Sequence, residues 1–438
     1  MSNAVIGIII FVCMIAAVLI GAPVYIAILG AVSVGVLIVG GPSILIQQLS
    51  TGIVSVSASY NFAVIPLFIT VGVLAGETAL GEGIFTACQK WLGRIRGGLL
   101  YTVIVGNAIF GACSGISSAG SIVFAKVAAP EMKKIGYDES LSLGTIAAAG
   151  VLSCLIPPSV GIMTFCLITE QSIGTGLMTG FSAGILMVII MLISAFAITR
   201  LMPGKVPSVT EADRNVTWKE RIKSLRLLVP VLLLFALVIG GSFFGWFPAT
   251  VGGAIASVAI MIYALAKKSG IKRVFMCVWE SAQMFAGIFL VIVACTLFSR
   301  FVTMTGLAQA ITNLIIASGL PAFVVMLIII IFYGICGCIM DAMSIILMTV
   351  PIVFPMLTGL GYNGFVICVI LVLCAELGAI TPPLGLSVFT VSSALRIKPS
   401  TVFKGVWPYI IIYVVAILLI VIFPDIILWL PKVMGAAV

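Results

Sequence analysis

Long apolar runs separated by short polar segments dominate this sequence. Runs of helix-spanning length fall near residues 4–21, 24–40, 61–80, 177–199, 227–244, 247–265, 281–299 and 405–424. A helix needs about 20 predominantly apolar residues to cross the hydrocarbon core of a bilayer. The pattern therefore predicts an all-α integral membrane protein.

Two apolar stretches are interrupted by small and polar residues near their middle. Segment 99–130 is broken at CSGISSAGS (113–121), and segment 321–358 is broken at GCIMDAMS (337–344). The first interruption leaves arms of roughly 12–14 residues, which are too short to span. Both stretches are predicted to be re-entrant hairpins that enter and leave on the same side.

Two more stretches, 141–170 and 364–395, each contain a Pro-Pro pair. Proline removes an amide donor and clashes with the preceding turn. Each stretch is therefore predicted to be a broken helix, interrupted at LIPPSVG and at ITPPLG.

The two halves repeat each other weakly at an offset of 225 residues. The matched positions are Pro130 and Pro355, Gly136 and Gly361, Tyr137 and Tyr362, and the pairs Pro157-Pro158 and Pro382-Pro383. Counting the broken helix but not the hairpin gives the first half five crossings. An odd number inverts the second half, so the sequence predicts inverted repeats and about ten crossings.

Charge supports this topology. Hydrophobic residues make up 62% of the chain and charged residues 8%, far below the quarter typical of soluble proteins. Of the 22 basic residues, 20 lie in segments 88–98, 126–139, 200–226, 266–273 and 396–404. All five fit on one side, which the positive-inside rule makes the cytoplasm, with the N-terminus outside. The net charge of +9 is thus a topology signal and predicts no nucleic-acid partner.

Residue types limit the chemistry. The sequence has no histidine, and its 11 cysteines sit in apolar runs, where they are expected to pack as small apolar residues. No HExxH, GxSxG or Walker-type motif occurs, which argues against an intramembrane enzyme and against ATP as the energy source. No cofactor is expected. The start has no basic region before its apolar run, so it is interpreted as a first membrane helix and not as a signal peptide.

Non-helical backbone at membrane depth survives only when it is buried in protein or lines a wet cavity. Paired broken helices in repeats are typical of secondary transporters. At these breaks the sequence resembles the large membrane subunit of TRAP (tripartite ATP-independent periplasmic) transporters. The resemblance lies in FGACSGISSAGSIVFAKVAAPEMKKIGYDESLSLGTIAAAGVLSCLIPPSVGI and in DAMSIILMTVPIVFPMLTGLGY followed by AITPPLG.

The resemblance implies an elevator-type carrier in the bacterial or archaeal cytoplasmic membrane. Sodium is expected as the coupling ion, and an unidentified organic acid is expected to bind between the hairpin tips. A small membrane subunit and an extracytoplasmic substrate-binding protein are the implied partners. The implied domains are scaffold helices in 1–80, 174–303 and 399–438, and a transport domain formed by repeats 81–173 and 304–398.

The resemblance and the helix breaks together suggest where sodium binds. The candidates are Ser114, Gly115, Ser117 and Ser118 at the first tip, facing Ser153, Cys154 and Pro157, and Cys338 and Asp341 at the second tip, facing Gly378 and Thr381. Sodium is a hard cation that prefers oxygen, which hydroxyls and freed carbonyls supply. The family tip usually has a serine where Ile116 stands, which removes one hydroxyl.

Four charged residues fall near these breaks. Asp341 and Glu376 are expected to lie deep, where each lowers the cost of a cation or pairs with Lys126. Two alternatives stay open for Lys126, a functional role in the membrane and a side chain that extends to the interface. Glu170 is expected to be an exposed loop charge. A stand-alone sodium-coupled carboxylate carrier is the alternative function, although its Ser-Asn-Thr tips are absent here.

Overall fold

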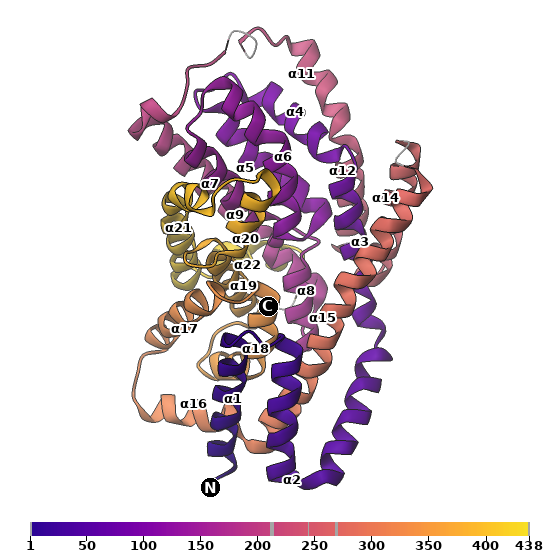
Figure 1. The fold of residues 1–438 in the computed structure, drawn as a ribbon, viewed down its shortest axis with the longest axis vertical. Coiled ribbons are helices and arrows are strands. Elements are labelled where there is room, and N and C mark those ends of the chain that lie inside the picture. The colour runs from indigo at the N-terminus through magenta and orange to yellow at the C-terminus, as the bar shows by residue number, and fades with distance from the viewer. Residues whose placement is uncertain (1, 211–213, 244, 268–269, 437–438) are drawn as a thin grey trace.

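The computed structural model describes residues 2–210, 214–243, 245–267 and 270–436, and every regular element in these ranges is a helix. Lys268, part of basic segment 266–273, lies outside the described residues. The N-terminus lies at one end of the long axis, whereas α4 (Leu80–Leu92) and α11 (Trp218–Ser224), which carry basic residues of segments 88–98 and 200–226, lie toward the other (Figure 1).

The first half contains ten further elements. They are α1 (Asn3–Leu19), α2 (Val24–Ser57), η1 (Tyr60–Ala63), α3 (Val64–Glu77), α5 (Gly98–Ser114), α6 (Ser117–Ile135), α7 (Glu139–Gly150), η2 (Val151–Cys154), α8 (Val160–Ile168) and α9 (Ile173–Leu201). Helix α2 is kinked at Gly41, whose positive φ of 80° suits glycine. After the kink the helix continues to Ser57, and the hydropathy pattern does not predict this second stretch.

In the described ranges, the connection and the second half contain fourteen further elements. They comprise η3 (Pro203–Lys205), η4 (Leu225–Leu227), α12 (Val229–Phe235), η5 (Ala236–Gly240), α13 (Gly241–Phe243), α14 (Ala249–Ala266), α15 (Ile271–Thr305), α16 (Leu307–Ala317), α17 (Ala322–Gly337), α18 (Ala342–Gly359), α19 (Gly364–Ile380), α20 (Leu386–Leu395), α21 (Pro399–Ile422) and α22 (Asp425–Val433).

Helix length and composition make this a multi-pass membrane protein. Within the described ranges, seven helices are long and apolar enough to cross a bilayer, or eight if the bent pair Trp218–Leu227 and Val229–Gly240 is one span. Helix α1 and the two broken segments, predicted as crossings, are shorter. The total of ten crossings therefore stays a prediction.

The 225-residue offset extends to helix boundaries. Helices α17, α18, α19 and α20 start 224, 225, 225 and 226 residues after α5, α6, α7 and α8. The turn chemistry repeats as well: Gly136 and Gly361 have φ of 92° and 90°, and the next helix is capped by Asp138 or Asn363. Left-handed glycine ends a helix and Asp or Asn begins one for local reasons, so equivalent turns form in both halves.

The interruptions in the two hairpins are narrower than predicted. Only Gly115 and Ile116 separate α5 from α6, and residues 338–341 separate α17 from α18. The arms are 17, 19, 16 and 18 residues long, so the expected 12–14 residues is wrong. The cause is that serine and glycine near the tips continue the helices, and the distal ends run past the apolar stretch.

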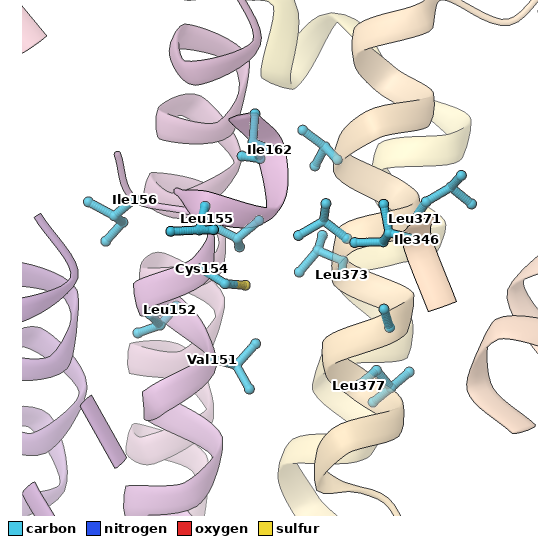
Figure 2. Packing of buried hydrophobic residues seen from close by; sticks show 14 of the residues in the cluster. Val151, Leu152, Cys154, Leu155, Ile156, Ile162, Ile346, Leu371, Leu373 and Leu377 are labelled. Atoms are coloured by element: carbon cyan, nitrogen blue, oxygen red, sulfur yellow. The ribbon is translucent and has the colours of Figure 1, made fainter. Parts of the chain in front are cut away.

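Both predicted broken helices are present. The first consists of α7, η2, a non-helical break and α8, and the second of α19, a break and α20. The Pro157-Pro158 and Pro382-Pro383 peptide bonds are both cis. Figure 2 shows Val151 and Cys154 of the first segment on the side that faces α19, with Leu373 and Leu377 across the interface. The two broken segments therefore share one buried core.

Helix α21 packs along α7. Tyr409 shares a 2.7 Å hydrogen bond with Thr145, and the Tyr413 hydroxyl donates to the Ala148 carbonyl at 2.9 Å. A Cβ on Gly144 would lie 2.1 Å from the Gly405 carbonyl carbon, so the helices meet backbone to backbone. The C-terminal helix predicted as scaffold thus contacts repeat 81–173 directly.

Candidate functional site: the two hairpin tips

The first hairpin tip (114–118) fits against the first broken helix. Gly115 has φ of 63° and accepts a 3.4 Å hydrogen bond from the Val160 amide. A Cβ at Gly115 would lie 1.7 Å from the Pro158 carbonyl oxygen, so only glycine permits this approach. Ser114 is fully buried, and its hydroxyl has no hydrogen-bond partner in the described residues. The Pro157-Pro158 break therefore faces the tip, as predicted.

Buried polar atoms of Asn107, Ser121 and Ser153 lie next to one another beside this tip. The Ser153 hydroxyl donates to the Asn107 carbonyl at 3.4 Å. Asn107 Oδ1 and the Ser121 hydroxyl are buried without a partner in the described part of the chain. A Cβ on Gly120 would lie 2.7 Å from Ser153 Oγ and 2.8 Å from Asn107 Oδ1. Sequence reasoning missed Asn107 and Ser121, although polar residues among glycines on hairpin arms are a usable signal.

Ser117 connects the two halves of the chain. Its hydroxyl donates to Glu376 Oε1 at 3.1 Å. Glu376 is only 6% exposed on α19, and its second oxygen, Oε2, has no hydrogen-bond partner among the described residues. The Cys154 thiol also lies beside Glu376. Glu376 is therefore enclosed by protein, its depth in the bilayer stays a prediction, and its position brings Ser117 and Cys154 to the second broken helix.

The second hairpin tip (338–341) packs on the end of α19. A Cβ on Gly378 would lie 2.3 Å from Gly337 Cα and 3.1 Å from the Cys338 amide nitrogen. The Thr381 hydroxyl donates to the Leu377 carbonyl at 2.7 Å, and the Cys338 thiol donates to the Gly334 carbonyl at 3.1 Å. Cys338 and Gly378 are thus brought together, and the Thr381 oxygen retains lone pairs for another ligand.

Asp341 is not enclosed by other side chains, and its depth in the bilayer stays a prediction. It is exposed and caps α18, accepting hydrogen bonds from the Ser344 amide at 3.0 Å and from the Ser344 hydroxyl. Aspartate in the N-cap position turns its carboxylate back toward the first turn of its own helix. Local capping therefore decides its orientation.

Ser118 and Lys126 belong to a different place. Both line a cavity of about 240 Å³, here called the Lys126 cavity, with Glu77, Glu82 and Glu280. Lys126 is exposed and makes no ion pair within the described ranges, so pairing with Asp341 or Glu376 is wrong. About two turns of α6 separate Lys126 from the end of the tip. Glu170 is exposed, as predicted.

The oxygens at the first tip suit a hard cation. Ser114 Oγ and Glu376 Oε2 are buried, unpartnered in the described structure and close to the helix break. Burial without a partner is costly for a hydroxyl and more so for a carboxylate. A cation bound at either oxygen would offset this cost for that oxygen.

Comparison with known proteins identifies the family. Residues 11–426 match the family described as "Tripartite ATP-independent periplasmic transporter, DctM component". The chain belongs to this family. Its expected likeness to a TRAP large membrane subunit is therefore confirmed.

Relatives of this DctM-family chain have several transport names. The C4-dicarboxylate TRAP transporter large permease protein DctM of Pseudomonas aeruginosa is 27% identical over 395 residues, 89% of this chain and 90% of the relative. The ectoine/5-hydroxyectoine large permease UehC of Ruegeria pomeroyi is 27% identical and covers 96% of this chain and 97% of its own. The sialic acid large permease SiaM of Vibrio cholerae is 24% identical over 88% of each.

Solved transporters share the fold. The Alcanivorax borkumensis YdaH transporter aligns with a TM-score of 0.59 at 15% identity, covering 90% of this chain and 89% of its own. Neisseria gonorrhoeae MtrF, described among antimetabolite efflux pumps, aligns with a TM-score of 0.60 at 14% identity over 98% and 95%. The chain therefore shares its overall fold with these two proteins.

Proposed function

We propose that this DctM-family protein is the large membrane subunit of a sodium-coupled transporter for a small organic acid, acting in the cytoplasmic membrane with its N-terminus outside. Family membership supports the tripartite assembly. The related large permeases are named for C4-dicarboxylates, ectoine and sialic acid. Each of these compounds carries at least one carboxylate, which favours an organic acid here.

The contact between Ser117 and Glu376 is the observation that carries the proposal. It joins the first tip to the second broken helix at 3.1 Å. A buried carboxylate is expensive in a membrane unless it has a counter-charge. Sodium coordinated by Ser114, Ser117 and carbonyls of the Pro157-Pro158 break would supply that charge, and its departure would loosen the tip.

The second tip is the candidate for a further ion. Cys338, Gly378 and Thr381 come together through the close approach of Gly337 to Gly378. Backbone carbonyls at the end of α19 and the Thr381 oxygen are the available ligands. Asp341 is exposed nearby, and both of its carboxylate oxygens already accept hydrogen bonds from Ser344. It would therefore attract the sodium ion through its charge and not by direct coordination.

An elevator motion fits this packing. Both broken segments share a core (Figure 2), so they are expected to move together. Their partner surface includes α3, where a Cβ on Gly72 would lie 2.5 Å from the Ser114 carbonyl oxygen. The small residue permits close approach and sliding between helices. The substrate is expected between the tips.

Two partners are part of the proposal, a small membrane subunit and an extracytoplasmic substrate-binding protein. The test is to reconstitute the chain with both in liposomes and measure uptake of C4-dicarboxylates, ectoine and sialic acid under an inward sodium gradient. The proposal expects uptake of one of them that requires sodium and all three components. Robust uptake by the chain alone would instead support the stand-alone carrier.

A further inference from the structure

A larger cavity, lined by both polar and apolar side chains, lies away from the two tips. It has a volume of about 910 Å³ and is lined by the end of α2, by η1, by the end of α8, by the starts of α9 and α14, and by residues 295–300 of α15. The name Arg300 cavity is used for it below. The loops after α8 and before α14 fall on the extracytoplasmic side in the predicted topology, so the cavity is expected to open there.

Among the described residues, Arg300 is the only basic one that lines this cavity. Its guanidinium donates to the Thr51 hydroxyl at 2.7 Å and, at 3.4 Å, to the Gln48 carbonyl and the Ser55 hydroxyl. All three acceptors are neutral, and no carboxylate of the described residues lies within 4.0 Å of it. A half-buried guanidinium held in place without a counter-charge is suited to bind a carboxylate from outside.

Two long helices begin at the same cavity. Ser172, Ile173 and Gly174 at the start of the 29-residue α9 line it, as do Ala249 and Thr250 at the start of the 18-residue α14. The first amides of a helix have no acceptor within it, and the N-terminal end carries partial positive charge. Both features favour an anion in the space between them.

Thr250 gives an independent indication of a ligand. It is 3% exposed, and its hydroxyl has no hydrogen-bond partner in the described structure although it lines the cavity. A buried hydroxyl without a partner costs free energy. A polar ligand in the cavity would remove that cost.

One acid, Glu170, also lines the Arg300 cavity. It is exposed on the loop between α8 and α9, so solvent screens its charge more than that of half-buried Arg300. The Lys126 cavity, which adjoins the other end of α3, has the opposite balance, with three glutamates and one lysine. The two cavities therefore differ in their balance of charged side chains, although Glu77 in the Lys126 cavity is already paired with Arg273.

From these features we propose that the Arg300 cavity recognises the carboxylate of the arriving substrate, with the Arg300 guanidinium as its anchor and the starts of α9 and α14 around it. This inference rests on the proposed function, because it assumes an anionic substrate. It places first recognition of the acid on the extracytoplasmic face, before the acid reaches the hairpin tips.

The test measures the electrostatic potential inside the Arg300 cavity, by comparing how fast an anionic and a cationic reagent modify a thiol placed there. Ser299→Cys is introduced beside Arg300 in a full chain whose exposed Cys13 is replaced by serine, and the chain without Ser299→Cys gives the background. The purified protein is treated with an anionic sulfonatoethyl or a cationic trimethylammonioethyl methanethiosulfonate. The anionic reagent is expected to react faster relative to its rate with a free thiol. Succinate is expected to slow the reaction.

Arg300→Gln and Glu170→Gln are the matched variants. Removing the guanidinium charge should slow the anionic reagent about threefold and speed the cationic reagent about threefold. The ratio of the anionic to the cationic reaction rate should therefore fall about tenfold. Glu170→Gln should raise the ratio, and succinate should protect only when Arg300 is present. An unreactive Ser299→Cys, or a ratio and succinate protection unchanged by Arg300→Gln, would overturn the inference. Neither result affects the sodium dependence of uptake, which tests the proposed function separately.

Discussion

The Ser117 hydroxyl donates a 3.1 Å hydrogen bond to Glu376, a residue 259 positions away. The bond joins the start of α6 in the first hairpin to α19 in the second broken helix. Glu376 keeps one oxygen unpartnered in the described structure, although it is buried. An ion that binds at the first tip would therefore interact with residues of both halves of the chain.

Replacing Ser117 with alanine should weaken sodium binding. The change removes one oxygen from a buried site, and a lost bond to a charged group costs about 1.5–3 kcal/mol. The sodium concentration for half-maximal uptake should rise roughly ten- to a hundredfold, with the protein still folded. Ser208→Ala, on an exposed loop, is the control and should leave that concentration unchanged. An unchanged value in Ser117→Ala would remove Ser117 from the coupling site.

Glu376→Gln should remove the negative charge of this side chain while keeping its size and shape. The amide keeps the size of the side chain and can still accept from Ser117, so the fold should survive. The stabilisation of a bound cation by a buried negative charge is lost, and sodium stimulation of uptake should fall by at least tenfold. Glu139→Gln, at an exposed acid in the first turn of α7, is the matched control. Equal sodium stimulation in the two variants would show that the Glu376 charge plays no part.

Local chemistry explains how much of this site was predictable. The breaks at the Pro-Pro pairs and the left-handed glycines Gly115 and Gly136 follow from the conformations of these residues alone. The Ser117–Glu376 contact does not, because nothing local pairs residues so far apart. The exposure of Asp341 could not be predicted from the apolar run around it, because capping of α18 decides where its carboxylate points.

The full length of helix α2 was also not predicted from the sequence. The stretch after Gly41 carries Gln47, Gln48 and Thr51, so hydropathy gave no span there. In the structure it continues α2, and Gln48 and Thr51 accept hydrogen bonds from Arg300. A polar face that pairs with a distant arginine is visible only once the tertiary arrangement is known.

Asp341 should show two separable roles. Asn caps a helix about as well as Asp, so Asp341→Asn should keep wild-type stability while its lost charge changes sodium dependence. Asp341→Ala also loses the bonds to Ser344, which should destabilise the protein by about 1 kcal/mol. Thermal unfolding in detergent and sodium titration of uptake measure the two effects. If Asp341→Asn also left the sodium titration unchanged, the second tip would have no electrostatic role.

The approach of Gly337 to Gly378 should tolerate no side chain. A Cβ on Gly337 would lie 2.8 Å from Gly378 Cα, whereas a Cβ on Gly334, one turn earlier, would meet nothing within 4 Å. Gly337→Ala should therefore cost about 1–3 kcal/mol through overpacking, and Gly334→Ala should not. Melting temperatures of the two variants in the same detergent decide this. Equal values would mean that the second tip does not pack as described.

The central claim is that a sodium gradient drives transport through the hairpin tips. The most direct measurement is uptake of a labelled organic acid into liposomes that contain this chain, the small membrane subunit and the binding protein, with external sodium or with potassium in its place. The account predicts uptake in sodium, none above background in potassium, and no stimulation by ATP. Uptake that persists after all external sodium is replaced by potassium would contradict it.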